Sequence, residues 1–318
     1  MRIILAKPRG FCAGVNMAID ALDQVLDLVG APVYVYHEIV HNKHVVERFV
    51  TRGAVFVEAL SEVPDGSTVV FSAHGVSPEL RREARERHLR AIDATCPLVS
   101  KVHSEAIRFA RQGHTIILIG HEGHDEIIGT MGEAPGRIRL VQSAAEVDAL
   151  EFPEGTSLAY LSQTTLSVDD ANTIVRRLRE RFPAIVAPPS EDICYATQNR
   201  QEAVRNIARD ADLVLVVGSQ NSSNSLRLRE IAADSGVPAY LVDSSDEIAD
   251  EWLVGKEVVA ITAGASAPEE IVAKCVELLR ERFGAVVEER TVREEEMRFQ
   301  LPVELRRMRA QREALEVG

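Results

Sequence analysis

Short apolar runs alternate with longer amphipathic stretches along most of the chain. The runs are rich in Val, Ile and Leu and are bounded by polar or glycine-containing segments, which is typical of buried β-strands. We expect strands at 32–36, 68–72, 115–119, 157–161, 213–217 and 257–262. Apolar positions between them recur at helical spacing, as in 168–182, which follows a capping signal at Ser167 and Asp170.

This alternation predicts an α/β fold with parallel sheets. Strands that are almost continuously apolar are buried on both faces, so helices should cover each sheet on two sides. Ligands of open parallel sheets gather beyond the carboxyl ends of the strands. The loops that follow strands are therefore the segments in which to look for chemistry.

Composition narrows the class of protein. With 318 residues, 46% of them hydrophobic and 27% charged, the chain has globular composition and room for two or three domains. A net charge of -13 argues against nucleic-acid or anionic-membrane partners, because both would repel an acidic surface. No signal-peptide core and no run near the length of a membrane span is present, so we expect a cytoplasmic protein.

Three copies of one module become visible when the loops are compared. Each copy has a cysteine that opens a helix, then a polar loop after a strand, then a second polar loop after a later strand. The first loop begins 29, 28 and 28 residues after its cysteine. The cysteines are Cys12, Cys96 and Cys194; the first loops contain His41, His124 and Ser222-Ser223-Asn224; the second loops contain His74, Thr164 and Ser266.

The repeat predicts three similar modules in a pseudo-threefold trefoil, with all nine positions following strands and converging on one central cleft. We expect module 1 at 14–96, module 2 at 97–193, module 3 at 194–283 together with 1–13, and a C-terminal arm at 284–318.

The three repeated cysteines indicate a metal site. A lone cysteine is usually a small buried hydrophobe, but a cysteine at a helix start is favoured as the thiolate, the form that binds metal. Ligation by sulfur alone suits a soft metal, and three ligands leave one position open. Cys275 lies mid-helix on the face of Ile271 and Leu278, so we expect a core residue and a weak candidate for a fourth ligand.

A 4Fe-4S cluster needs four ligands, so three cysteines would leave one iron open to a water, hydroxyl or alkoxide. We therefore predict such a cluster on Cys12, Cys96 and Cys194. Zinc could also take three thiolates, but the absence of CxxC pairs and the wide spacing fit neither a zinc ribbon nor a ferredoxin run.

The polar loops predict an anion site beside the cluster. Imidazoles, hydroxyls, an amide and helix N-termini in one cleft suit phosphate oxygens. The segment 120–126 adds His and Glu side chains that can deliver protons, although its spacing does not match the HExxH signature of zinc proteases. Neither a Walker A motif nor GxGxxG is present, so electrons should come from a partner protein.

These segments closely resemble those of the 4-hydroxy-3-methylbut-2-enyl diphosphate reductases, iron-sulfur enzymes of the non-mevalonate isoprenoid pathway. The resemblance runs from Pro8 to Glu269, with a further similar segment, VREEEMRFQLP. The matching segments are PRGFCAGV, EIVHNK, SAHGVS, DATCPLV, GHEGHDE, SQTTLSVDD, DICYATQNRQ, NSSNS and GASAPE.

The resemblance implies a trefoil of three α/β modules around a 4Fe-4S cluster on the three cysteines, with no role for Cys275. It implies Glu126 as proton donor, with Thr164 near the substrate alcohol and His124 beside them as catalytic residues. The diphosphate would be bound by His41, His74, His124, Ser222, Ser223, Asn224 and Ser266, with Thr164 also contacting substrate.

The reaction implied is reductive dehydroxylation of (E)-4-hydroxy-3-methylbut-2-enyl diphosphate to isopentenyl and dimethylallyl diphosphate. Electrons would arrive one at a time from a ferredoxin or flavodoxin, and we expect a monomer. Two alternatives stay open: an iron-sulfur hydro-lyase acting on a phosphorylated small molecule, which needs no electrons, and a cluster-bearing sensor without catalysis.

Overall fold

The computed structural model describes residues 1–317 as an α/β fold with three parallel sheets, which confirms the expected fold class. The first sheet has the order β3-β2-β4-β5. Its strands are β2 (Val33–Tyr36), β3 (Ala54–Val57), β4 (Thr68–Phe71) and β5 (Arg90–Asp93). The helix α1 (Ala13–Val29) precedes β2 in the chain. The helices α2 (Lys43–Thr51) and α3 (Pro78–Glu86) and a 3-10 turn, η1, at Leu60–Glu62 lie between the strands in the chain.

The second sheet has the order β7-β6-β8. Its strands are β6 (Thr115–Ile119), β7 (Ile138–Val141) and β8 (Leu158–Ser162). The helices of this region are α4 (Pro97–Arg111), α5 (Asp125–Glu133), α6 (Ala144–Asp148) and α7 (Val168–Arg181). Val186 adds a single parallel bridge to Ala159 of β8, at the edge where a fourth strand would lie.

The third sheet has the order β10-β9-β11-β1-β12. Its strands are β1 (Arg2–Lys7), β9 (Leu213–Val217), β10 (Ala239–Val242), β11 (Val258–Ala263) and β12 (Val286–Thr291). The helices are α8 (Tyr195–Ala208), α9 (Ser223–Asp234), α10 (Asp250–Leu253) and α11 (Glu269–Phe283), with a 3-10 turn, η2, at Ser245–Glu247; α12 (Val303–Val317) follows.

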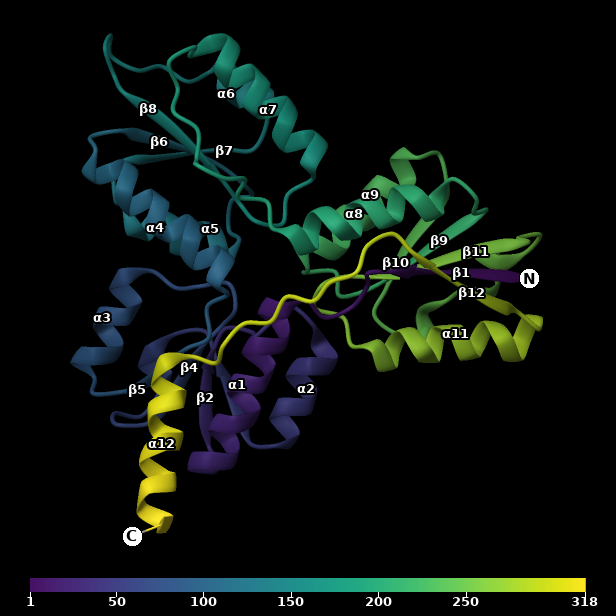
Figure 1. The fold of residues 1–318 in the computed structure, drawn as a ribbon, viewed down its shortest axis with the longest axis horizontal. Helices are drawn as coiled ribbons and strands as arrows, with labels where there is room; N and C mark the ends of the chain where they lie inside the picture. Colours follow the sequence, from purple (N-terminus) through teal and green to yellow (C-terminus); the bar gives the residue numbers. More distant parts are fainter. Residues whose placement is uncertain (318) are drawn as a thin grey trace. The chain divides into compact units, whose positions relative to one another are not determined.

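All six expected strands are confirmed to within one residue at each end, and α7 begins at the expected residue. Ser167 caps α7 by accepting a hydrogen bond from the backbone N–H of Asp170, as the sequence predicts. The expected C-terminal arm contains β12, which pairs with β1 over the whole length of that strand. In Figure 1 the purple N-terminal strand lies directly beside the yellow β12.

The strands β9, β11 and β1 of the third sheet are buried on both faces, whereas the edge strand β12 is largely exposed. Alternate residues of β9 point to opposite faces: Leu215 packs with the apolar face of α11, and Val214 and Val216 pack against α8 and α9. Cys275 of α11 is fully buried in the first of these clusters, which confirms the expected core position. The two layers of helices on this sheet can be followed in Figure 1.

The chain divides into two compact units. The first unit contains Met1–Ala13, His41–Val45 and Cys194–Met297, and therefore the whole third sheet. The second unit contains Gly14–Val40, Val46–Ile193 and the chain from Arg298 onward, and therefore the first and second sheets together.

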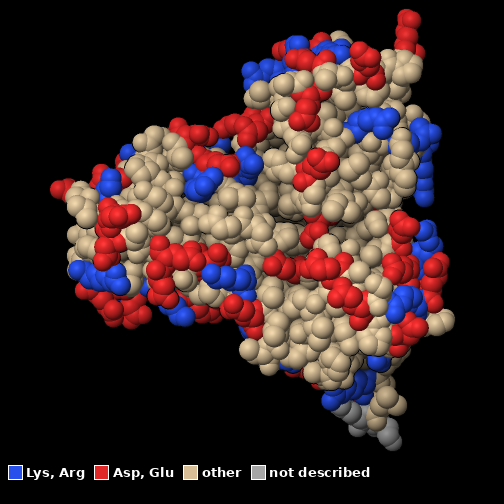
Figure 2. Space-filling model, turned by 180° about the vertical axis from the view of Figure 1, so that it is seen from behind, with Lys and Arg blue, Asp and Glu red and all other residues tan. Residues whose placement is uncertain are grey.

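The surface carries charged side chains of both signs. Figure 2 shows one face of the molecule, on which Asp and Glu side chains lie in small groups that alternate with Lys and Arg. Within residues 1–317, the helices are too short or too polar for any of them to pass through a bilayer.

The three sheets share one strand order. If β1, β5 and β12 are left aside, each sheet has three strands, of which the second along the chain lies on one side of the first and the third lies on the other side: β3-β2-β4, β7-β6-β8 and β10-β9-β11. The order thus reverses between the first and third strands, and the crevice at such a switch point is where open α/β sheets bind ligands. Beyond the third strand lie β5, the bridge at Val186 and β1, respectively.

Candidate functional site

The polar loops found by sequence follow the two strands that flank each switch point. His41 comes after β2 and His74 after β4; His124 comes after β6 and Thr164 after β8. In the third sheet the Ser222–Asn224 loop follows β9 and Ser266 follows β11. The repeat therefore marks the carboxyl edge at which ligands bind in this class of sheet.

Each cysteine follows the strand or bridge that lies next to the third strand of the shared order. Cys12 comes after β1 and Cys96 after β5, and Cys194 follows the bridge at Val186. The expectation that all nine positions follow strands is therefore wrong for Cys194, because the second sheet is completed there by a single bridge and not by a strand.

Each cysteine opens a helix, as the sequence predicts. Cys96 is the N-cap of α4 and Cys194 that of α8, while Cys12 directly precedes α1. The Cys194 Sγ accepts a hydrogen bond from the backbone N–H of Thr197 at 3.4 Å. Free N–H groups and the positive end of the helix dipole favour the thiolate at such positions.

Backbone contacts tie two of the cysteines to the polar loop of their own sheet. The Cys12 N–H donates to the Ala265 carbonyl, next to Ser266, at 3.2 Å, and the Cys96 N–H donates to the Ala73 carbonyl, next to His74, at 3.0 Å. The fully buried Arg200 also holds the Cys12 loop, because its Nη2 donates to the Gly10 carbonyl at 2.8 Å. In these two sheets the cysteine and the polar loop are thus joined through short stretches of backbone.

The donor set fits a metal cluster and separates the fourth cysteine from the other three. Cys12, Cys96 and Cys194 are partly exposed at helix starts, where thiolates form readily. Burial, with a smaller effect from Asp246 and Glu247, raises the pKa of Cys275 to about 12, so its thiol stays protonated. Three sulfur ligands without nitrogen or oxygen are the donors that an iron-sulfur cluster uses.

Glu126 is a buried carboxyl group that accepts two hydrogen bonds from Thr164, in the loop after β8. It is 2% exposed on α5. The Thr164 N–H donates to its Oε1 at 2.7 Å, and the Thr164 hydroxyl donates to its Oε2 at 2.9 Å. The structure therefore joins two of the predicted catalytic residues, one from each side of the switch point of the second sheet.

The pKa of Glu126 is raised from 4.5 to about 7. Loss of solvation is the main cause; the two hydrogen bonds from Thr164 oppose it, and the charge of Asp192 adds to it. A carboxyl group with a pKa near neutrality can hold and release a proton at physiological pH.

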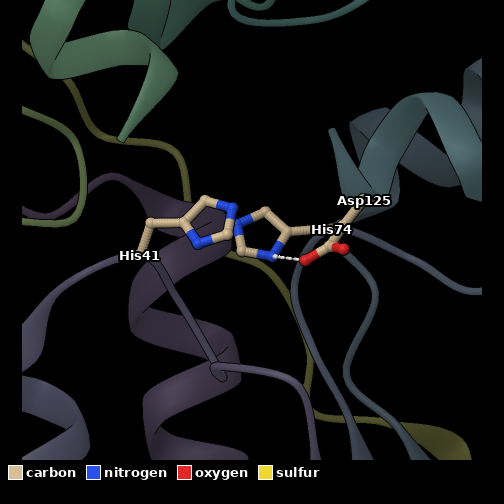
Figure 3. Close-up of side chains that lie close together, drawn as sticks. All are labelled: His41, His74 and Asp125. Atoms are coloured by element: carbon tan, nitrogen blue, oxygen red, sulfur yellow. Dashed lines mark ion pairs between the residues drawn. The ribbon is translucent and has the colours of Figure 1, made fainter. Parts of the chain in front are cut away.

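His124 is the N-cap of α5 and lies next to this pair in the chain. Its Nδ1 accepts from the backbone N–H of Glu126 at 3.1 Å, so a neutral ring carries its proton on Nε2. The ring of His74 packs edge-on against it, with centroids 5.8 Å apart. His74 also faces Asp125, with 3.8 Å between Nδ1 and Oδ2. Figure 3 shows this ion pair, together with His41 of the first unit.

The start of α9 forms a second polar cluster, in the first unit. Ser222 caps the helix by accepting from the Ser225 N–H, and its Oγ lies 3.4 Å from that of Ser266. The Ser266 hydroxyl donates to the His41 carbonyl at 2.9 Å. Helix N-termini bearing hydroxyl groups bind phosphate oxygens without any net positive charge on the protein.

Asn224 in this cluster has an unsatisfied amide. Its side chain is buried, and neither Oδ1 nor Nδ2 has a hydrogen-bond partner. A buried amide without partners costs about 1–3 kcal/mol, so such a group indicates a ligand that completes it. A Cβ on Gly264 would come within 1.9 Å of the Ser225 Oγ, so glycine is needed for the loop to approach α9.

Sequence reasoning missed three residues that shape these sites. Asp192 is buried, accepts from the Ser162 N–H at 2.9 Å and pairs with Lys101 at 2.9 Å. Ser225 donates to Ser222, and His37 contacts Asp125. Asp192 and Ser225 lie inside the segments DICYATQNRQ and NSSNS, next to predicted site residues, and could have been identified from that position. Nothing in the sequence indicates the contact of His37 with Asp125.

Comparisons with known proteins agree with this geometry. The family model described as LytB protein matches residues 3–280. The 4-hydroxy-3-methylbut-2-enyl diphosphate reductase of Rhodopirellula baltica is 61% identical over 314 residues, which is 99% of this chain and 98% of the relative. The enzyme of that name from Zymomonas mobilis is 53% identical over 314 residues, or 99% of this chain and 92% of the relative.

Solved structures give the same result. The E-1-hydroxy-2-methyl-but-2-enyl-4-diphosphate reductase of Plasmodium falciparum has a TM-score of 0.96 and 41% identity, covering 98% of this chain and 99% of that one. The structure described as (E)-4-hydroxy-3-methyl-but-2-enyl diphosphate reductase, the terminal enzyme of the non-mevalonate pathway, has a TM-score of 0.63 and 30% identity, covering 88% and 100%. A family match over most of the chain, with relatives above 50% identity along nearly its full length, shows that the chain belongs to the LytB protein family.

Proposed function

We propose that the chain is an oxidoreductase that converts (E)-4-hydroxy-3-methylbut-2-enyl diphosphate into isopentenyl and dimethylallyl diphosphate, the last step of the non-mevalonate isoprenoid pathway. The relatives are named for this substrate, and the chain belongs to their family. The reaction takes two electrons and two protons per substrate and releases the hydroxyl group as water.

The observation that carries the proposal is the buried Glu126. Its pKa of about 7 leaves a large fraction protonated at neutral pH, and Thr164 donates to both of its oxygens. We assign Glu126 as the proton donor to the leaving hydroxyl, with the Thr164 hydroxyl as the contact between them and His124 beside them. After the transfer, the Thr164 N–H and hydroxyl can both donate to the Glu126 carboxylate and stabilise it.

Cys12, Cys96 and Cys194 would hold a 4Fe-4S cluster, with the three modules arranged as a trefoil around it. When bound, the cluster supplies single electrons and, at the iron without a cysteine, a place for the substrate oxygen. The proposal rests on the donor set, which consists of three thiols at helix starts, and on the exclusion of Cys275 by its raised pKa.

The diphosphate would be bound at the carboxyl edges of the sheets. The unpaired amide of Asn224 and the hydroxyl groups at the start of α9 support this assignment, because phosphate oxygens would satisfy them. The full set that we assign consists of His41, His74, His124, Ser222, Ser223, Asn224 and Ser266, with Thr164 also contacting the substrate.

We further propose a ferredoxin or flavodoxin as electron donor, a monomeric state and a cytoplasmic location. The division into modules at 14–96, 97–193 and 194–283 with 1–13 also stays a proposal. The shared strand order supports it, because each module then contains one copy of that order.

The test is anaerobic purification with iron and sulfide analysis, followed by incubation with the substrate and dithionite. We expect an iron-sulfur protein that forms isopentenyl and dimethylallyl diphosphate only when the reductant is present. Turnover without a reductant would favour the hydro-lyase alternative, and an iron-free, colourless protein would refute the assignment.

A further inference from the structure

The carboxylate of Asp125 lies between two histidines of the second unit. Its Oδ1 is 2.8 Å from Nδ1 of His37, and its Oδ2 is 3.8 Å from Nδ1 of His74, a distance that suits an ion pair and not a hydrogen bond. The Ser72 Oγ lies 3.4 Å from the same nitrogen of His74. His37 follows β2 and His74 follows β4, whereas Asp125 is the first residue of α5, which follows β6 of the second sheet. The contact therefore joins a loop of the first sheet to a helix of the second sheet within one unit. Figure 3 shows the side of the carboxylate that faces His74.

His37 is held by its own backbone and by its neighbours. Its φ of 55° is in the left-handed region, which few residues other than glycine adopt. Its N–H donates to the Val57 carbonyl at 2.9 Å, and its ring stacks on Tyr36 with centroids 4.0 Å apart. Residues in such uncommon conformations persist where the surroundings fix them, and they cluster at functional sites.

Two carboxylates, Asp125 and Glu58, lie beside the ring of His37. The hydrogen bond to Asp125 is the main cause that raises the pKa of His37, and Glu58, 3.7 Å from Nε2, adds to it. His37 is thereby favoured as a cation, which offsets the negative charge of Asp125. Without this offset, a carboxylate beside His74 would repel an anionic ligand.

We propose that Asp125 and His37 are positioning residues of the diphosphate site. His37 fixes the Asp125 carboxylate, whose negative charge attracts the Nδ1 side of His74 and, together with the Ser72 hydroxyl, so presents Nε2 to the diphosphate. This inference rests on the proposed function, because it takes His74 as a diphosphate ligand. Carboxylates commonly orient functional imidazoles in this way, by fixing which ring nitrogen faces away.

The experiment uses the purified holoenzyme and six variants. Inorganic diphosphate is titrated in calorimetry, and the turnover of substrate is measured in the steady state. We expect Asp125→Ala to raise the Kd for inorganic diphosphate and the KM about tenfold, with kcat changed less than twofold. His37→Asn, which keeps a residue tolerant of positive φ, should raise both about threefold. The double variant should be no worse than Asp125→Ala, because His37 acts through Asp125.

Two further variants separate a positioning role of Asp125 from simple repulsion of the anion and from a general loss of stability. Asp125→Asn keeps the acceptor without the charge, so it should fall between wild type and Asp125→Ala; tighter binding than wild type would overturn the proposal, because the carboxylate would then only repel the anion. Asp148→Asn is the matched control, since Asp148 pairs with Arg177 at 2.6 Å on an exposed surface. A general loss of stability would lower kcat and the melting temperature and leave the Kd unchanged, which also contradicts the inference.

His74→Ala separates this inference from the function on which it rests. If His74→Ala loses affinity for inorganic diphosphate while Asp125→Ala binds like wild type, the positioning role is wrong and the proposed diphosphate site stands. If His74→Ala itself binds like wild type, His74 is not a diphosphate ligand and both assignments fall.

Discussion

Replacing Glu126 by Gln should make the protein more stable and less active, and the gain in stability should depend on pH. The folded-state pKa of Glu126 is about 7, against an ordinary value of 4.5. Between these values the folded state keeps a proton that the unfolded chain has released. Stability therefore falls as pH rises from 4.5 to 7.

The magnitude follows from the size of the shift. Each pKa unit is worth about 1.4 kcal/mol, so the wild-type protein loses roughly 3 kcal/mol through Glu126 by pH 8. Gln is neutral at every pH and has nearly the same shape. Its carbonyl can accept from the Thr164 N–H, and its amide can donate to the Thr164 hydroxyl, so the variant avoids the loss.

The assay is urea unfolding of the cluster-free protein, followed by circular dichroism, at pH 5, 6, 7 and 8. The variant should match wild type near pH 5 and exceed it by about 3 kcal/mol at pH 8. Glu277→Gln, which changes an exposed residue of α11, is the control and should give no such trend.

An equal stability difference at pH 5 and pH 8 would refute the reasoning, because Glu126 would then carry no raised pKa. In the reconstituted enzyme the same variant should lose roughly 100- to 10,000-fold in turnover, the usual contribution of a positioned proton donor. Near-normal turnover would remove Glu126 from the proton path.

Three further predictions concern the other site residues. Thr164→Val removes a hydrogen bond that lowers the pKa of Glu126, so that pKa should rise. In a profile of kcat between pH 6 and 9, the fall of activity at high pH should move to higher pH, and activity should be lower throughout. Cys96→Ser should lose most bound iron in a colorimetric assay, whereas Cys275→Ala should retain it and cost about 1 kcal/mol of stability as a small cavity; equal iron loss in both would contradict the ligand assignment. Asn224→Ala should weaken binding of inorganic diphosphate about tenfold in calorimetry without lowering the melting temperature of the ligand-free protein, because it removes a buried amide that has no partner; a lower melting temperature with unchanged affinity would refute this.

Most of the strands that the sequence predicts are buried on both faces, although β1 is also buried and was not predicted. β9 is continuously apolar and is found to the residue, whereas β5 has Arg90 and Asp93 at its ends and β12 is exposed over most of its length. Short edge strands have polar or mixed sequences, so their hydrophobic pattern does not differ from that of a loop.

The candidate site divides in a similar way. The loop positions were predictable because they recur in a constant order, with the first loop at nearly the same spacing after each cysteine, and order and spacing are properties of the sequence. The raised pKa of Glu126 could not be predicted, because it comes from burial in the folded chain, and its size depends on opposing hydrogen bonds from Thr164, 38 residues away. The contact of His37 with Asp125 spans 88 residues and matches no repeated position, so it follows only from the folded chain.

The place of β1 in the third sheet sets an order of events during synthesis. Ile4 of β1 pairs with Ala260 on one side and with Glu288 on the other. A ribosome adds about 5–20 residues per second, so β1 waits on the order of 15–60 s for its second neighbour. The first cysteine to be synthesised therefore gains its folded surroundings only when the chain is almost finished.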